Sequence, residues 1–247
     1  MTSLLASEIL RFRSRRLVQA ALGLQLLAIV VAGVIVVLRA EFELRGLPDI
    51  VLGASFVPVT FGWVLGASAI GADWHTGHMT TILTWEPRRP RVHGAKVLAV
   101  VLGVFVLTVL VQASLAGVLA LAAFTTGSAE GASPGWLTET LGIVLRTSAL
   151  ASAFAVFGFA IASVGTNTAA ALGVAFGYLV VLENLVRGLR PQWTPWLLVE
   201  NAARWAMPAD AFAPTGRSSL AAGLYLVAVA VGLFALATAW FRVRDVN

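Results

Sequence analysis

The sequence lacks cysteine altogether and is poor in charge. With no cysteine among 247 residues, disulfides, thiolate metal sites and cysteine nucleophiles are excluded. Charged residues make up 12% of the chain, whereas a soluble domain usually carries about 25%. This is too little polar surface to cover a water-soluble globule, so we expect a membrane protein.

Signatures of catalysis are also missing. The phosphate-loop pattern GxxxxGK[ST] does not occur, because the nearest string, VHGAK at residues 92–96, lacks the first glycine and the hydroxyl residue. No segment between the hydrophobic runs is long enough to fold as an ATPase, and no Ser–His–Asp arrangement is apparent. We expect neither catalysis nor a bound cofactor from this chain alone. Nor do we expect a nucleic-acid partner, since arginines flanking membrane spans explain the net charge of +5.

Long apolar runs dominate what is present. They predict an all-α integral membrane protein with one transmembrane domain over residues 1–247 and spans at about 17–38, 50–72, 97–123, 140–164, 166–186 and 219–241. No small-residue cleavage pattern follows the first run, so we expect it to stay as an anchor. Only residues 165–168 join the fourth and fifth spans, which predicts that these two helices are antiparallel neighbours.

The basic residues predict the orientation of these spans. One side has Arg11, Arg13, Arg15, Arg16, Arg88, Arg89, Arg91, Lys96, Arg242 and Arg244, and the other has Arg39, Arg45, Arg187, Arg190, Arg204 and Arg217. The richer side is expected to be the cytoplasm, which places both termini and the 73–96 loop inside and residues 187–218 outside.

Residues 3–16, before the first span, form an amphipathic pattern. Leu5, Ile9 and Phe12 fall on one helical face, opposite Arg11. The pattern predicts an interfacial helix in contact with lipid of the inner leaflet. A simple positively charged anchor fits the composition equally well.

Residues 187–218 contain three tryptophans and four prolines among apolar runs too short to span. Tryptophan favours the membrane interface, so we expect short re-entrant or interfacial helices there. A pattern in this region repeats: Glu183 and Arg187 are spaced as Glu200 and Arg204 are, and residues four apart on a helix can pair.

Two charges fall inside predicted spans. Arg146 in the fourth and Glu183 in the fifth lie at similar depths, which predicts an ion pair, although both could instead reach the interface separately. The spacings Gly62/Gly66 and Gly173/Gly177 allow close helix approach. Pro58 in the second span predicts a kink.

The 73–96 loop is more than a basic connection. Its first part continues the second span as a short helix containing Met79, Ile82, Leu83 and Trp85, and prolines then turn the chain back. Such apolar residues are unexpected in a solvated loop, so we interpret the helix as a docking site for another protein. A solvated loop is the alternative.

The string GHMTTILTWEPRRPRVHGAK, residues 77–96, resembles the segment after the second span in permeases of the ABC type-2 exporter family, especially small actinobacterial-type permeases. The matching residues are Gly77, Thr80, Thr81, Ile82, Leu83, Pro87, Arg88, Arg89, Arg91, Val92 and Lys96. His78 and His93–Gly94 depart from the pattern.

The resemblance implies a multi-pass permease of a bacterial plasma membrane that exports a hydrophobic or amphiphilic compound such as an antibiotic, peptide or lipid. It implies a second permease subunit, forming a homodimer in preference to a heterodimer, and a separate ABC ATP-binding subunit that holds ATP and Mg. The implied coupling residues are Trp74, His75, Gly77, His78, Thr80, Thr81, Ile82, Leu83, Trp85, Glu86, Arg88, Arg89 and Arg91. The implied path residues are Thr60, Trp63 and Tyr178, and the implied outer gate is Arg146, Glu183, Arg187, Glu200 and Arg204.

Two other functions remain open. In one, the chain is a regulatory or signalling membrane protein whose loop docks a different partner and which transports nothing. In the other, it is an intramembrane enzyme in which Asp73, His75 and His78 share a metal.

Overall fold

Helices are the only regular elements in residues 2–39, 42–126, 134–207 and 217–244, the parts of the chain that this computed structural model describes. Six helical segments are long and apolar enough to cross a membrane: Arg16–Leu38, Leu44–His75, Arg89–Thr125, Trp136–Gly165, Thr168–Leu189 and Ser219–Val243. The predicted all-α architecture is therefore confirmed for these residues, and so are six segments long and apolar enough to span a membrane. Residues 208–216 of the predicted outer region lie outside the described residues.

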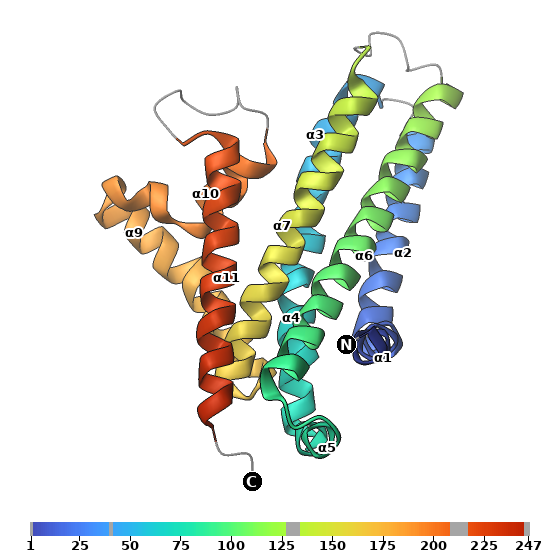
Figure 1. Cartoon of the computed structure of the whole chain (residues 1–247). Helices are drawn as coiled ribbons and strands as arrows, with labels where there is room; N and C mark the ends of the chain where they lie inside the picture. The colour runs from blue at the N-terminus through green and yellow to red at the C-terminus, as the bar shows by residue number, and fades with distance from the viewer. Residues whose placement is uncertain (1, 40–41, 127–133, 208–216, 245–247) are drawn as a thin grey trace.

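The elements follow one another without a strand in the described chain. They are α1 (Thr2–Ser14), α2 (Arg16–Arg39), η1 (Leu44–Gly46), α3 (Leu47–Ala54), α4 (Phe56–His75), α5 (His78–Trp85), α6 (Arg89–Thr126), α7 (Trp136–Gly165), α8 (Thr168–Phe176), η2 (Gly177–Leu182), α9 (Glu183–Leu189), η3 (Pro191–Trp196), α10 (Leu198–Ala206) and α11 (Ser219–Val243). Helices α1 and α5 and the end of α11 lie at the same end of the molecule (Figure 1).

Helices α4 and α7 form the centre of the bundle. A Cβ at Gly62 would come within 2.4 Å of the carbonyl oxygen of Ala151, and one at Gly66 within 1.9 Å of that of Ala155. The first predicted small-residue spacing therefore does bring two helix backbones together. The second does not, because a Cβ at Gly173 or Gly177 would meet nothing within 4 Å.

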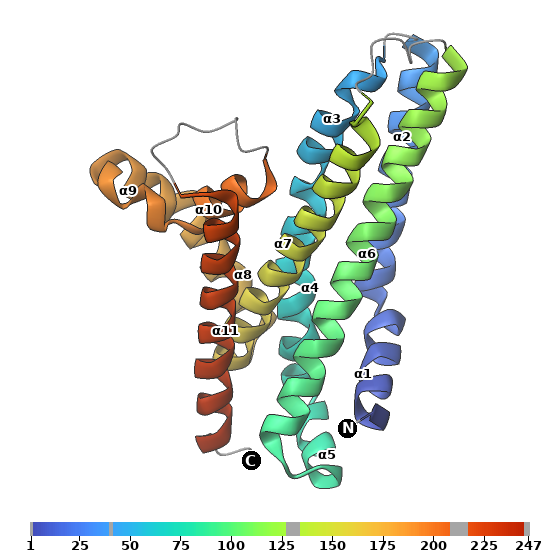
Figure 2. The same cartoon turned by 45° about the horizontal axis from the view of Figure 1, so that its top comes forward.

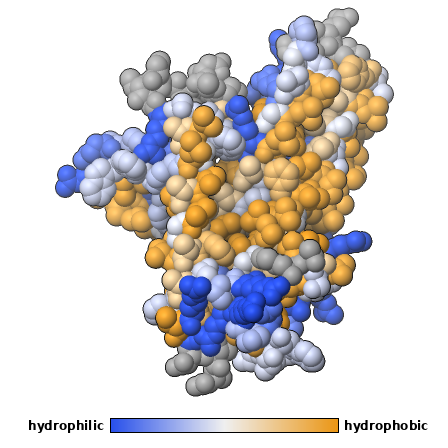
Figure 3. All heavy atoms as spheres, in the orientation of Figure 1, coloured by the Kyte–Doolittle hydropathy of each residue, from blue (hydrophilic) through white to orange (hydrophobic). Residues whose placement is uncertain are grey.

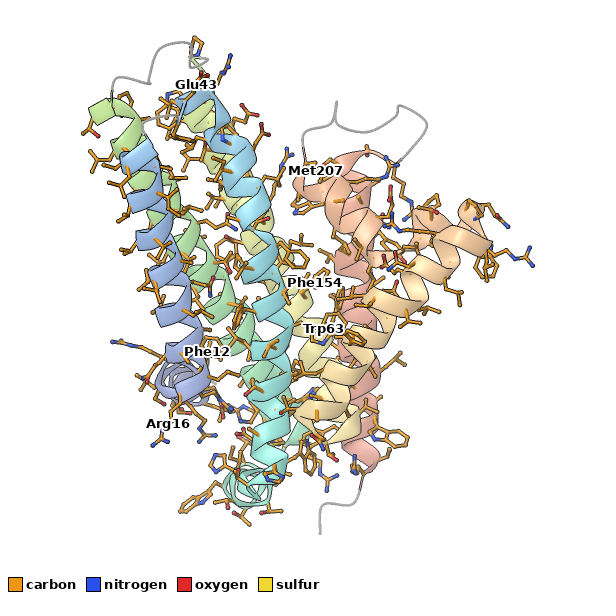
Figure 4. All side chains as sticks on the ribbon, turned by 180° about the vertical axis from the view of Figure 1, so that it is seen from behind. Phe12, Arg16, Glu43, Trp63, Phe154 and Met207 are labelled. Carbon is orange, nitrogen blue, oxygen red and sulfur yellow. The ribbon has the colours of Figure 1, made fainter. Side chains whose placement is uncertain are left out.

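Aromatic side chains pack around this backbone contact. Trp63 of α4 is 4% exposed and lies edge-on to Phe154 and Phe157 of α7, with ring centroids 5.8 and 5.9 Å apart. Trp63 and Phe154 are labelled in Figure 4. Trp63 also donates its Nε1 hydrogen to the carbonyl of Ala171 at 3.3 Å, which attaches α8 to the same core.

The second span is interrupted at Ser55, between α3 and α4. Pro58 lies three residues later, and its ring clashes with the carbonyl four residues before it in a continuous helix, that of Ala54. Helix α3 ends at Ala54, and the Ser55 hydroxyl donates to the carbonyl of Leu52 at 2.5 Å. The predicted irregularity thus takes the form of a one-residue turn at Ser55 between two helices.

The third span begins earlier than predicted. Helix α6 begins at Arg89, whereas the third span was predicted to begin at about residue 97. The connection between α5 and α6 is therefore only residues 86–88. Pro90 does not prevent this, because a proline in the first helical turn removes an N–H that has no partner within the helix.

Helix α1 packs on the protein in addition to carrying an exposed apolar face. Phe12 is 6% exposed and lies against Gly103 of α6, and Glu8 is buried on the same side. Ile9 and Leu10 are exposed. The predicted apolar face is therefore divided: Phe12 belongs to the core, and Ile9 points outward.

The fifth spanning segment lies at the edge of the bundle. Helix α8 contacts α4 and α7, but η2 is a π-helix, and α9 leads away from the other spans (Figures 1 and 2). Few residues of this segment are buried, and its exposed apolar side chains include Phe176, Val181 and Leu185.

Candidate functional site

Helix α5 is a short surface helix held between two spans. Gly77 precedes it with φ of +69°, in the left-handed region that favours glycine, and this turn ends the continuation of α4. Met79 is completely buried, whereas Trp85 at the other end of the helix is 87% exposed. The helix is thus anchored at its start and presents a bare aromatic ring at its end.

The remaining predicted coupling residues on α5 divide between two faces. Ile82 and Leu83 are half-buried, whereas Thr80 and Thr81 are exposed. The Thr80 hydroxyl donates to the carbonyl of Gly77 at 2.6 Å, a local bond that supports the first turn. The exposed face of α5 therefore consists of threonines and Trp85.

The connection after α5 is fixed to the end of α11. Glu86 and Arg91 form an ion pair at 3.2 Å. Arg89 donates to the carbonyls of Phe241 and Arg242, each at 3.3 Å, and to that of Arg244. These carbonyls have no partner within α11, so Arg89 caps that helix from another segment.

Five charged side chains form a cluster next to the start of α5: Glu8, Asp73 and Lys96, which are buried, and Arg11 and Arg15, which are partly exposed. Lys96 contacts Asp73 at 2.5 Å and Glu8 at 3.0 Å, and Arg15 contacts Asp73 at 2.8 Å. Arg11 completes the cluster at 3.4 Å from Glu8 and 4.0 Å from Asp73. The cluster joins α1, the junction before α2, α4 and α6.

These residues lie in separate predicted segments, and the cluster they form was not predicted from the sequence. Arg15 also donates to the carbonyls of Ser68 and Ala69 at 3.0 and 2.9 Å, which fixes the α1–α2 junction to α4. The available signal was the placement of Asp73 and Lys96 at the near ends of two consecutive spans, with unpaired charges in the N-terminal arm.

His93, a departure from the family pattern, is fully buried at the same end. Its Nδ1 lies 2.8 Å from the Thr238 hydroxyl and its Nε2 2.9 Å from the Ser163 hydroxyl. Its ring stacks on Phe234, with centroids 5.0 Å apart. A neutral imidazole has one donor and one acceptor, so two hydroxyls satisfy it within an aromatic core.

Trp74 and His75 lie at the end of α4, before α5, and of the two only His75 is exposed. Trp74 packs edge-on against Phe241 at 5.9 Å, and Arg244 lies over its ring at 5.5 Å. Asp73, the third member of the possible metal set, is engaged by Lys96 and Arg15. Within the described residues no group of three histidine or acidic side chains could hold a metal ion.

At the opposite end, both predicted Glu/Arg pairs form. Arg187 lies 3.7 Å from Glu183, and Arg204 lies 2.9 Å from Glu200. Arg187 also reaches Glu200 at 3.5 Å, which links the pairs. Glu183 accepts a hydrogen bond from the backbone N–H of Val199 at 2.9 Å. The four charges therefore tie α9 to α10.

The predicted ion pair between Arg146 and Glu183 is wrong. The Arg146 guanidinium lies 5.9 Å from the centre of the Trp205 ring. The backbone carbonyl of Arg146 accepts a hydrogen bond from Trp205 Nε1 at 2.8 Å. Although α7 and α8 are joined by a short turn, the chain diverges from α7 before it reaches Glu183 (Figure 2). Equal depth was therefore not enough to predict a contact.

The three predicted path residues have different environments. Trp63 and Tyr178 line a hollow of about 260 Å³ between α4, α7, α8, η2, α10 and α11, whose lining is mainly apolar and aromatic. The Tyr178 hydroxyl accepts from the N–H of Leu198 at 3.2 Å. Thr60 is exposed, donates to the carbonyl of Phe56 and does not line this hollow.

No protein-family model matches the chain, and no curated protein matches it. Its function therefore has to be inferred from its own residues and their geometry.

Proposed function

We propose that the chain is the membrane-spanning permease subunit of an ATP-driven ABC exporter and that α5 is its coupling helix. The observation that carries the proposal is α5 itself: a short helix between the second and third spans, with Met79 buried and Trp85 87% exposed. A large exposed aromatic ring next to polar surface is typical of a protein contact, where tryptophan often contributes a large share of the binding energy.

The surroundings of α5 support movement of the helix together with the spans. Met79 is buried in the protein, and the ion pair of Lys96 with Asp73 joins α6 to the end of α4 just before α5. Separating buried opposite charges is costly, so these segments are expected to move as one body. A force on α5 from an ATPase would then reach α1, α4 and α6 together.

The orientation of the spans, a second subunit, the cargo and an outer gate complete the proposal. The end with α5 faces the cytoplasm of a bacterial cell, as the distribution of basic residues favours. A second permease subunit, preferably a second copy, completes the path. The apolar hollow at Trp63 and Tyr178 favours a hydrophobic or amphiphilic cargo. The Glu/Arg network of α9 and α10 forms the outer gate.

ATP hydrolysis tests the proposal. The ATPase subunit encoded beside this chain is purified with and without the chain in lipid, and its rate is compared for the unmodified chain, Trp85→Asp and Trp193→Asp. Trp193 is also exposed but lies in η3, at the opposite end from α5. We expect the unmodified chain and Trp193→Asp to bind the ATPase and change its rate, and Trp85→Asp to lose both effects.

An ATPase that neither binds nor responds to the unmodified chain would refute the exporter proposal. Binding of a different protein through Trp85 would then favour a signalling role. Equal losses in both tryptophan variants would mean that α5 is not the contact.

A further inference from the structure

A hollow of about 470 Å³ lies where the connection after α5 meets the end of α11. It is lined by Pro87, Arg88, Arg89, Pro90, Arg91 and Arg242. Four of its six lining residues are arginines, contributed by chain segments about 150 positions apart. Glu86, an acidic residue beside the hollow, pairs with Arg91 and offsets one of these charges.

The arginines differ in how they are engaged. Arg89 donates to backbone carbonyls at the end of α11, and Arg91 pairs with Glu86. The guanidinium groups of Arg88 and Arg242 have no polar partner within the part of the chain that the structure describes, and both residues are exposed. Two unengaged cations thus lie at the rim of a hollow that two other arginines help to shape.

The two helices that meet at the hollow show where it lies along the spans. Helix α6 starts at Arg89 and α11 ends at Val243, and both contain candidate membrane spans. Just along these helices, Leu98, Trp240 and Val243 are exposed apolar side chains. Figure 3 shows hydrophilic side chains gathered at this end of the molecule, directly below apolar surface. In a membrane crossed by these two helices, the hollow would open at the level where lipid headgroups meet acyl chains.

We propose that this hollow binds the phosphate of an anionic phospholipid headgroup, with Arg88 and Arg242 as its ligands and the acyl chains on the adjoining apolar surface. Guanidinium groups bind phosphate through paired charge-assisted hydrogen bonds. Basic pockets between membrane helices are suited to anionic headgroups. A bound lipid would bridge the segment after α5 and the end of α11, the same two parts that Arg89 already joins.

Trp240 and the apolar surface along α6 and α11 favour lipid over an acidic protein surface. These exposed side chains lie beside the arginines on helices long and apolar enough to cross a membrane, where they can contact acyl chains. The proposal does not rest on transport, because a chain that binds no ATPase would still retain the lipid.

Lipid retention by the full chain tests the assignment. Purified protein in neutral detergent is titrated with phosphatidylglycerol, phosphatidylcholine or inorganic phosphate, and bound lipid is counted by native mass spectrometry. The double variant Arg88→Gln/Arg242→Gln is compared with Arg13→Gln/Arg16→Gln, which removes the same charge from exposed residues in the N-terminal arm. We expect phosphatidylglycerol to bind preferentially and the first variant to weaken it by about tenfold or more, because each arginine near an anionic lipid contributes on the order of 1 kcal/mol. The control should retain the preference.

Four results would overturn the proposal. An equal loss in the control would assign the effect to general surface charge. No preference for phosphatidylglycerol would remove the headgroup site. Complete displacement by inorganic phosphate would identify a site for free phosphate. Unchanged lipid binding with loss of ATPase binding in the first variant would identify a protein contact. Thermal unfolding of both variants without lipid checks that each is folded.

Discussion

Lys96 of α6 and Asp73 of α4 form an ion pair with 2.5 Å between Nζ and Oδ2, although both side chains are almost fully buried. Each has a second partner: Glu8 contacts Lys96, and Arg15 contacts Asp73. A buried charge is tolerated only when it is paired and hydrogen-bonded. The N-terminal helix is therefore part of the cluster that holds the two spans on either side of α5.

Asp73→Asn should destabilise the chain strongly. The substitution leaves Lys96 and Arg15 with less compensating charge in a buried site, and breaking such a pair costs about 3–5 kcal/mol. Unfolding in detergent, followed by circular dichroism during titration with sodium dodecyl sulfate, measures the loss. Asp49→Asn is the matched control, because Asp49 is exposed in the first turn of α3. A loss for Asp73→Asn no larger than that of the control would contradict a structural role for the cluster.

Gly66→Ala should separate α4 from α7. The new Cβ would lie 1.9 Å from the carbonyl oxygen of Ala155, a backbone atom that no side-chain rotation can move away. Overpacking of this kind costs about 1–3 kcal/mol. The same unfolding titration measures it.

Gly173→Ala is the control for this change. It lies in α8 with nothing within 4 Å of the position of its Cβ, so the substitution should leave stability unchanged or raise it by up to about 1 kcal/mol. Equal effects of the two substitutions would mean that α4 and α7 do not approach as closely as the structure shows.

Glu183→Ala should loosen α10. The substitution removes the acceptor of the partly buried Val199 N–H and one partner of Arg187. Because a fully buried unsatisfied donor costs about 1–3 kcal/mol, we expect a loss towards the lower end of this range. Faster limited proteolysis between η3 and α10 reports the change. Glu139→Ala, at an exposed position in α7, is expected to leave the cleavage rate as it is. Unchanged cleavage in Glu183→Ala would show that this contact does not hold α10.

The sequence predicted the spans well because each depends on a local run of apolar residues. It also predicted the pairs Glu183–Arg187 and Glu200–Arg204, since residues four apart meet on any helix. It failed for Arg146 and Glu183, and for the cluster around Lys96, because these depend on how separate helices diverge or cross. The burial of His93 was hidden for the same reason: Ser163 and Thr238 become its partners only after α6, α7 and α11 pack.

Mild acid should lower the free energy of unfolding of the chain because of His78. Its position at the start of α5, next to the charged cluster, lowers its pKa below the usual value of 6.5. Burial disfavours the charged ring most, and Arg11 then repels it; Lys96 adds to this, whereas Asp73 and Glu8 oppose it. Its Nε2 atom is buried without a hydrogen-bond partner in the described residues. The unfolded chain therefore takes up a proton below about 6.5 that the folded chain resists.

The stabilisation from this group is fully present above pH 6.5 and decreases as the pH falls from 6.5 towards the lower folded pKa. Titration of unfolding at several pH values, for the unmodified chain and His78→Gln, isolates the contribution. We expect the free-energy difference between the two proteins to shift in favour of His78→Gln as the pH falls. The same pH series on His75→Gln is the control: it shows the effect of removing a histidine at another position. A difference that is independent of pH between 8 and 5 would show that His78 is not held in the neutral form by its surroundings.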